Sequence, residues 1–251
     1  MCGRMDIHTP PAQLARRLGV PLAKDVDPEG DPSWNIAPSR GVPVVIERAS
    51  PGADGTQGIE GPYLYVFHWG LLPYWAKTPT VGYKMINAKA ETLATSAAYR
   101  IPFRQRRCLV VADGFYEWHP SESGKLKRTT PYYFWRADGA PLTFAGLYQT
   151  WWDKSRSEEP DPETILRTCT IVTTDAGPDV ADIHDRMPVV LEEKDRDAWL
   201  DPWSHDTAAL SKLLVPAPRG TLGRREVSTA VSSPQNDGPE LIKESIAAAF
   251  H

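Results

Sequence analysis

A dense succession of strand-like segments in the middle of the chain constrains the fold more than any other feature. Between residues 107 and 175, runs of β-branched and aromatic residues alternate with polar stretches. The runs are CLVVADG, FYEWH, PYYFWRA, LTFAGLYQT and ILRTCTIVTT. Such residues favour strands, and strands that follow one another across polar loops favour antiparallel pairing. The pattern therefore predicts a mostly antiparallel, barrel-like β-sheet core.

Helical signals are few and lie outside this core. We expect short helices in PPAQLARRLGV, near residues 91–99, in EEKDRDAWL and in TAALSKLL. Further strands are expected in GVPVVIE and PYLYVFHW, with REVSTAV as a closing strand. The chain has no internal repeat and no linker long enough to divide it. These features predict a single α+β domain over residues 1–251, with a few peripheral helices.

The composition is that of an ordinary globular protein, with 41% hydrophobic and 24% charged residues. No apolar run approaches the roughly 18 residues that span a bilayer. Polar residues and prolines interrupt the N-terminus early, so no signal peptide is expected and the predicted location is the cytoplasm. The three cysteines are too few and too widely spaced for a disulfide framework. Cys108 and Cys169 lie in apolar strands and are expected to be buried thiols.

Charge is distributed unevenly along a chain whose net charge is -4. Between Trp69 and Arg136, eleven Lys/Arg face four Asp/Glu, and this segment holds thirteen of the 24 aromatic residues. A basic, aromatic surface is typical of proteins that bind single-stranded nucleic acid. A set of solvated surface charges explains the same balance equally well from charge alone.

Motifs for the common cofactor and metal enzymes are missing from the sequence. None of the six histidines stands at metal-ligand spacing from another His or a Cys. The chain contains no GxGxxG, no P-loop and no GxSxG sequence. We therefore expect neither a metal nor a cofactor.

Cys2 follows the initiator methionine directly, so removal of Met1 would place an α-amine and a thiol on one residue. An amine of this kind titrates near pH 7.7–8.0 and a free thiol near 8.5, so both react at neutral pH. The pair condenses with an aldehyde, first to an imine and then to a five-membered thiazolidine. Alternatively the amine serves as the base of an N-terminal-nucleophile hydrolase. A chance cysteine at an unstructured terminus is the plain alternative.

Three polar residues at strand edges are further candidates for chemistry. Glu117 lies between Tyr116 and Trp118, where aromatic neighbours would raise its pKa toward that of a general acid/base. Asn87 in INAKAET and His184 in DIHDRMP complete the set. Taken singly, each has an ordinary structural interpretation: a surface carboxylate, a turn residue and a hydrogen-bonding histidine.

Together the motifs give the chain a clear resemblance. It resembles the SOS-response-associated peptidase family, whose members process abasic sites in single-stranded DNA. The resemblance covers nearly the whole chain in family order and rests on MCGR, WNIAPSR, FHWGLLPYWAK, INAKAET, RCLVVADGFYEW, TFAGLYQTW, CTIVTTDA, IHDRMPVVL and VSSPQNDGPELI.

The resemblance implies a mechanism and a site. Family members lose Met1 and trap the ring-opened aldehyde of an abasic site as a thiazolidine DNA–protein crosslink, with weak lyase activity as a side reaction. The implied catalytic residues are Cys2, Asn87, Glu117 and His184. Pro38 and Thr173 match positions that line the family's DNA groove. We further expect Arg4, Lys89 and Arg186 to contact phosphates and Trp69 to stack on a base. The implied partner is single-stranded DNA containing abasic sites, and the protein is expected to be a monomer.

One position departs from the family pattern. Lys89 stands where an arginine is common, which keeps the charge but loses the bidentate fork that grips a phosphate. Two other functions stay open from the sequence: a cysteine peptidase that uses Cys2, and a non-catalytic module that binds single-stranded DNA.

Overall fold

The computed structural model describes residues 2–51, 56–120, 129–157, 159–161 and 163–245. Its strands, arranged in two sheets, are β1 Met5–Ile7, β2 Ser33–Ile36, β3 Gly41–Pro51, β4 Gln57–Trp69, β5 Asn87–Lys89, β6 Arg107–Ala112, β7 Gly114–Pro120, β8 Thr129–Arg136, β9 Leu142–Trp152, β10 Ile165–Asp175, β11 Arg186–Pro188 and β12 Leu222–Glu226. Its helices are α1 Pro11–Leu18, α2 Arg100–Gln105, α3 Glu193–Leu200 and α4 Thr207–Ser211, with 3₁₀ turns η1 Pro79–Lys84, η2 Ala90–Thr92, η3 Thr229–Ser232 and η4 Pro239–Ile242.

The larger sheet closes on itself. Its order is β11-β10-β4-β3-β6-β9, and β9 also pairs with β10. Strands β10, β4, β3, β6 and β9 therefore form a closed ring, with β11 paired to β10 outside it. Pairing is antiparallel except where β10 meets β4 and β5. Closure removes free sheet edges and fills the interior with side chains. The predicted α+β fold with a mostly antiparallel, barrel-like core is confirmed.

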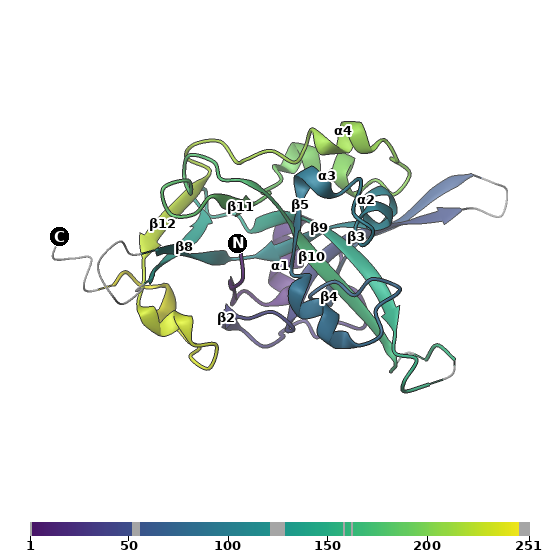
Figure 1. The fold of residues 1–251 in the computed structure, drawn as a ribbon, viewed down its shortest axis with the longest axis horizontal. Coiled ribbons are helices and arrows are strands. Elements are labelled where there is room, and N and C mark those ends of the chain that lie inside the picture. The colour runs from purple at the N-terminus through teal and green to yellow at the C-terminus, as the bar shows by residue number, and fades with distance from the viewer. Residues whose placement is uncertain (1, 52–55, 121–128, 158, 162, 246–251) are drawn as a thin grey trace.

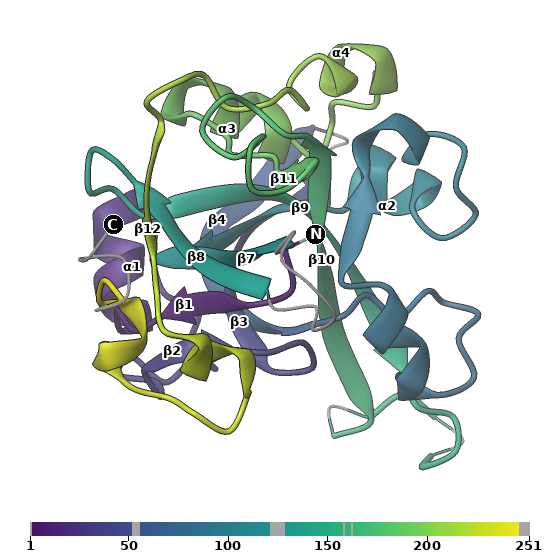
Figure 2. The same cartoon turned by 60° about the vertical axis from the view of Figure 1, so that its left-hand side comes forward.

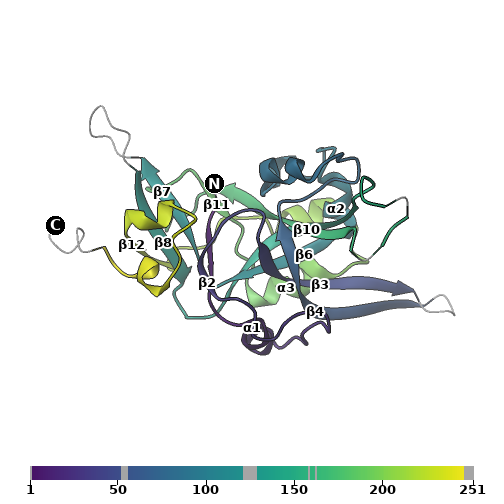
Figure 3. The ribbon, with the colours of Figure 1, turned by 90° about the horizontal axis from the view of Figure 1, so that it is seen from below.

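The smaller sheet has the order β12-β8-β7-β1-β2, so the N-terminal strand β1 lies inside it between β7 and the edge strand β2. Figure 1 shows β8 and β12 at one end of the molecule, while the long β3–β4 hairpin projects at the other. Figure 3 shows the same separation from below. In Figure 2 the purple strand β1 lies beside β7 and β2, its two pairing partners. The start of the chain is thus held inside a sheet.

Local signals placed most elements correctly, and two expectations need correction. Helix α1 ends at Gly19, whose φ of 70° fits the left-handed cap that glycine favours. The helix expected near residues 91–99 instead begins at Arg100, after turns in which Thr92 and Thr95 hydroxyls donate to nearby backbone carbonyls. The closing strand is β12, which ends at Glu226, and the TAV segment beyond it forms η3.

Burial follows the strand pattern. Cys108 and Cys169 have no exposed surface, as expected, and both are free thiols. Within the described residues, no helix combines the length and the apolar character needed to cross a bilayer.

Candidate active site

Strand β1 delivers Cys2 to a position beside Glu117. The backbone N–H of Tyr116 donates to the Arg4 carbonyl at 3.0 Å, and Met5 pairs with Phe115 on β7. In an antiparallel ladder, each step back along β1 is one step forward along β7. Continuing the register places Glu117 opposite Gly3, one residue from Cys2.

Asn87 reaches the same point from the other sheet. It begins β5, whose parallel pairing with β10 sets Asn87 against Ile171. Its Nδ2 donates to the Cys2 carbonyl oxygen at 2.6 Å. Its Oδ1 is buried and has no hydrogen-bond partner among the residues that the structure describes. A buried acceptor without a donor costs about 1–3 kcal/mol, so this oxygen is a ready acceptor for an N–H group in the site.

The Cys2 thiol is fully buried and protonated at neutral pH. Burial, reinforced by the negative charge of nearby Glu117, raises the pKa of the thiol far above its ordinary value. The backbone N–H of Arg4 donates to the sulfur and partly opposes this rise. The sulfur therefore needs a base close by before it can act as a nucleophile.

Glu117 has the properties of that base. Its side chain is 3% exposed, and burial raises its pKa from 4.5 to about 7. A carboxyl group that titrates near neutral pH can both donate and accept a proton in one reaction cycle. The expectation that its surroundings raise its pKa is consistent with this burial.

His184 faces Glu117 with Nε2 lying 4.0 Å from Oε2. Its Nδ1 accepts a hydrogen bond from the Arg186 backbone N–H at 2.9 Å and also lies 2.9 Å from the Asp185 carboxylate. These two contacts demand opposite protonation of Nδ1. We favour the backbone bond, because the Asp185 side chain is 87% exposed and screened by water. Burial lowers the pKa of His184, so the neutral ring carries its proton on Nε2, toward Glu117.

The structure thus brings together the four residues expected to be catalytic, from strands β5 and β7, the N-terminus and the loop before β11. Within this group, a hydrogen bond links Asn87 to Cys2, and His184 lies within ion-pair distance of Glu117. Met1, whose removal is expected from the sequence, lies outside the described residues.

Protein groups hold the Arg4 guanidinium in place, so it is less available to a DNA phosphate than a free side chain would be. Its Nη1 donates to Asn35 Oδ1 at 2.7 Å and to the Val231 carbonyl at 2.8 Å, and its guanidinium lies 6.0 Å from the Trp118 ring centre. The arginine therefore ties the first residues to the C-terminal segment.

Asn35 is the residue that sequence reasoning missed. It is buried, accepts from Arg4, and its Nδ2 donates to the carbonyls of Val231, Ser233 and Asn236. A signal is present in the sequence, because Asn35 lies in the WNIAPSR motif and its three acceptors lie in the VSSPQNDGPELI motif. The two motifs alone do not show that the Asn35 side chain of the first forms hydrogen bonds with backbone carbonyls at the second.

Lys89 and Arg186 lie near each other but differ in availability. Lys89 is exposed at the end of β5. Arg186 bonds Glu91 and Asp175 at 2.7 Å and donates to the Thr173 carbonyl at 2.8 Å. A phosphate at Arg186 has to compete with two carboxylates, whereas Lys89 meets solvent directly.

Of the remaining DNA-binding candidates, Trp69 stands apart. Pro38 lies half-buried in the turn after β2, and Thr173 is buried on β10 beside Lys89. Trp69 has no exposed surface, and its indole N–H donates to the Ile86 carbonyl at 3.0 Å. A ring without exposed surface offers no face to a base, so in this structure Trp69 serves the core. Exposed aromatics are found a few residues on, at Tyr74 and Trp75.

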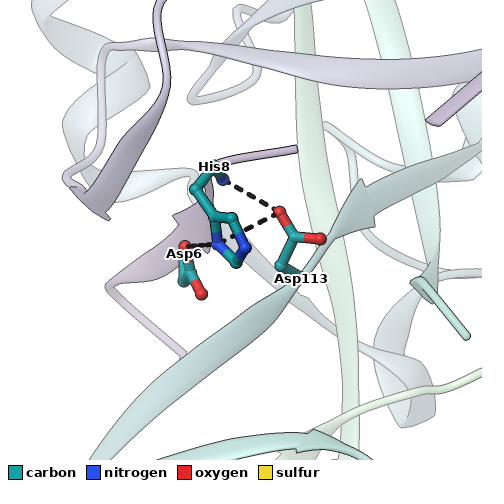
Figure 4. A group of neighbouring side chains, drawn as sticks. All are labelled: Asp6, His8 and Asp113. Carbon is teal, nitrogen blue, oxygen red and sulfur yellow. Dashed lines mark hydrogen bonds and ion pairs between the residues drawn. The ribbon is translucent and has the colours of Figure 1, made fainter. Parts of the chain in front are cut away.

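A second polar cluster anchors strand β1 just beyond Cys2 (Figure 4). Asp113 accepts hydrogen bonds from the backbone N–H groups of His8 and Thr9 and from the Thr9 hydroxyl, all within 2.9 Å. Fully buried Asp6 accepts from Tyr133 at 2.7 Å and lies 2.8 Å from His8 Nδ1. A ring nitrogen of His8 and one carboxylate oxygen each of Asp6 and Asp113 lie close enough together to hold a metal ion, but protein donors already engage both carboxylates. We interpret the cluster as structural.

Replacement of Asp113 tests this interpretation. Asp113→Ala leaves two backbone N–H groups and a hydroxyl without their charged acceptor, which should lower the free energy of unfolding by about 2–4 kcal/mol. Urea denaturation measures the change. Asp31→Ala, at an exposed position in the loop before β2, is the control and should stay within about 0.5 kcal/mol of wild type. Equal stabilities for the two variants would contradict the anchoring role.

The model of the SOS response associated peptidase family matches residues 1–234. The chain belongs to this family. The abasic site processing protein YoqW of Bacillus subtilis is 36% identical over 97% of this chain and 99% of its own length. The abasic site processing protein HMCES of Gallus gallus is 32% identical over 96% of this chain and 77% of its own length.

Solved structures with a similar fold are known. A crystal structure of a protein from Bacteroides thetaiotaomicron superposes with a TM-score of 0.79 and 22% identity, covering 98% of this chain and 100% of that one. A phage-related protein from Bordetella bronchiseptica gives a TM-score of 0.62 at 29% identity, covering 94% and 99%. The likeness at 22% identity speaks for the fold alone.

Proposed function

We propose that this protein processes abasic sites in single-stranded DNA by forming a covalent thiazolidine crosslink through Cys2, once Met1 has been removed. The observation that carries the proposal is the convergence of Cys2 with Asn87 and of Glu117 with His184 at one buried point. Its relatives YoqW and HMCES are named as abasic site processing proteins, which supports the same substrate.

The reaction needs no oxidant and no cofactor. The α-amine of Cys2 attacks the aldehyde carbon of the opened sugar, and the resulting carbinolamine loses one water to give an imine. The sulfur then adds to the imine carbon, the thiol proton passes to the nitrogen, and the ring closes. With a pKa of about 7, Glu117 donates a proton to the departing hydroxyl and accepts one from the thiol.

Two neighbours assist in this scheme. The Oδ1 of Asn87, now without a donor, accepts from the amine and orients it toward the aldehyde. His184, with its Nε2 proton, donates to the ring oxygen as the deoxyribose opens. Because the imine is also the intermediate of β-elimination, weak strand cleavage is an expected side reaction.

Binding of the strand is proposed to use the cations at the site together with exposed rings. Lys89 offers an exposed ammonium group, while Arg4 and Arg186 add positive charge and are held in place by protein partners. Pro38, which is half-buried, lines the same face in this proposal, while Thr173 has no exposed surface and lies beneath it. Base stacking is assigned to Trp75, which is 50% exposed, in place of the buried Trp69. A monomer in the cytoplasm suffices for this function.

A denaturing gel tests the proposal directly. The protein is mixed with single-stranded DNA that carries one abasic site, and the expected result is a slower band that survives detergent. The same strand after borohydride reduction, which converts the aldehyde to an alcohol, should give no such band. Absence of the band with intact aldehyde would overturn the proposal and favour a non-catalytic binding module. Turnover of a peptide that depends on Cys2 would favour the peptidase.

Asn87→Ala removes both the bond to the Cys2 carbonyl and the acceptor proposed for the amine. Misplacement of a reacting group by about 1 Å can cost about 100-fold in rate, so adduct formation should slow by about 10- to 100-fold. A time course on denaturing gels measures the rate. Thr95→Ala, at an exposed position in the same loop, is the control and should react like wild type. A wild-type rate for Asn87→Ala would remove Asn87 from the site.

A further inference from the structure

The surface around helix α2 carries two concave cavities that the proposed chemistry does not use. One has a volume of about 170 Å³ and is lined by Tyr74, Ile101 and Arg106, among others. The other has a volume of about 400 Å³ and is lined by Arg48, Arg106, Tyr148 and Trp203, among others. Arg106 lines both, so the two cavities form one track across α2. The blue segments at the right of Figure 2 contain α2 and the loops that lead to it.

Positive charge dominates this track. Among the described residues that line either cavity there is no Asp or Glu. Arg100 and Arg104 add two exposed guanidinium groups one turn apart on α2. By contrast, the cavity beneath residues 25–31 has four carboxylates in its lining, from Asp25, Asp27, Glu29 and Asp31. The side chains that line the α2 cavities therefore differ in the sign of their charge from those of this cavity, whose volume of about 410 Å³ is close to that of the larger α2 cavity.

Not every cation of the RIPFRQRR stretch contributes. Arg107 is 2% exposed and donates to the carbonyls of Phe103, Arg104, Trp199, Asp201 and Ser204, so it joins α2 to the end of α3. Arg48 and Arg106, in contrast, have no ion pair with a carboxylate in the part of the chain that the structure describes. Their guanidinium groups face a tyrosine ring and a glutamine oxygen. Both can therefore take an anionic ligand without breaking a salt bridge.

Aromatic rings stand at intervals along the same track. Tyr74 is 71% exposed, and Trp203 is half-buried with its indole N–H bonded to the Gly58 carbonyl. Proteins that bind single-stranded DNA combine cations that contact its phosphates with aromatic rings on which its bases stack, since each unpaired base has a free face. A duplex hides those faces in its own stack and would leave the rings unused.

One end of the track lies close to the proposed active site. Ala98 lines the smaller cavity, and the hydroxyl of the next residue, Tyr99, donates to the Asn87 carbonyl at 3.3 Å. We propose that the α2 track, defined as Arg48, Tyr74, Arg100, Arg104, Arg106 and Trp203, binds the single-stranded DNA that flanks the crosslink site. The inference rests on the proposed function only for the identity of that strand.

Charge reversal on α2 tests the track without touching the active site. Two unmodified strands, about 25 and about 6 nucleotides long, distinguish an extended surface from a local one, since single-strand sites commonly cover 4–16 nucleotides. In fluorescence anisotropy, Arg100→Glu/Arg104→Glu should bind the long strand at least about tenfold more weakly than wild type. The slope of log affinity against log salt should fall by about 1.4, because each lost phosphate contact removes about 0.7.

Two further variants keep the test decisive. Tyr74→Ala should weaken long-strand binding by about tenfold without changing the salt slope, since stacking carries no charge. Arg16→Glu/Arg219→Glu is the control, with the same charge change at exposed positions on α1 and in the loop before β12. If the α2 double variant binds the long strand within about twofold of this control, the track is not a DNA-binding surface.

Crosslinking reports on the proposed function separately. With the short strand carrying one abasic site, the α2 variant should form adduct at the wild-type rate, because the active site is unchanged. A slowed rate on the short strand would show that α2 belongs to the active site and contradict a separate track. If wild type itself forms no adduct, the proposed function fails, while the anisotropy measurements still decide for or against the track.

Discussion

Cys2→Ala should abolish the detergent-resistant adduct with abasic single-stranded DNA. Removal of the sulfur leaves an amine that can form only an imine, which water hydrolyses when the strand is denatured. Cys2→Ser should give a weaker adduct, because an oxazolidine is less stable than a thiazolidine. The measurement is the fraction of labelled strand shifted on a denaturing gel, with at least a 100-fold loss expected for alanine.

The other two cysteines supply the matched control. Cys108 and Cys169 are as fully buried as Cys2, and burial raises the pKa of each thiol in the same direction. Neither has a free α-amine. Cys169→Ala should therefore form adduct at the wild-type rate. Loss of adduct in that variant, or its survival in Cys2→Ala, would refute the N-terminal mechanism.

Glu117→Gln should slow adduct formation by about 100-fold, the usual loss when a general acid/base is removed. The wild-type rate should peak near pH 7, where burial places the pKa of Glu117 and both its protonated and ionised forms are present. Glutamine keeps the shape but cannot exchange a proton, so the peak should flatten. An unchanged pH profile would show that another group moves the proton.

The same substitution should stabilise the protein at high pH. The folded-state pKa of Glu117, about 7, lies above its ordinary value of 4.5, so the folded protein binds this proton more tightly. The stabilisation of the folded state by this protonated carboxyl group is fully present below pH 4.5 and is lost as the pH rises through 7. At pH 8, Glu117→Gln should therefore be more stable than wild type by up to about 3 kcal/mol, with the gain vanishing near pH 4.

Urea unfolding at the two pH values checks this expectation. Glu193→Gln, in the exposed first turn of α3, is the control and should change stability little at either pH. A gain for Glu117→Gln that is equal at pH 4 and pH 8 would mean that packing, not charge burial, explains it. A gain only at high pH would identify Glu117 as a residue whose burial costs stability and serves the site.

Much of the architecture could be predicted from local pattern. The strand runs between residues 107 and 175 became β6 to β10, because β-branched and aromatic side chains favour a pleated, half-buried backbone. Gly19 ended α1 where a left-handed cap was needed. The ordered motifs also sufficed to place the chain in its family. Each of these depends on residues that are neighbours in sequence.

What the sequence by itself determined, then, is the type and order of the long strands and of helices α1, α3 and α4, the family, and the candidate site residues. Only the tertiary structure decided which side chains meet and which meet solvent. It buried Trp69 and Arg107, exposed Lys89, bound Arg4 to Asn35, and gave Glu117 a pKa of about 7. The physical reason is that burial, hydrogen bonding and pKa depend on contacts between residues far apart in the chain, such as Asn87 with Cys2.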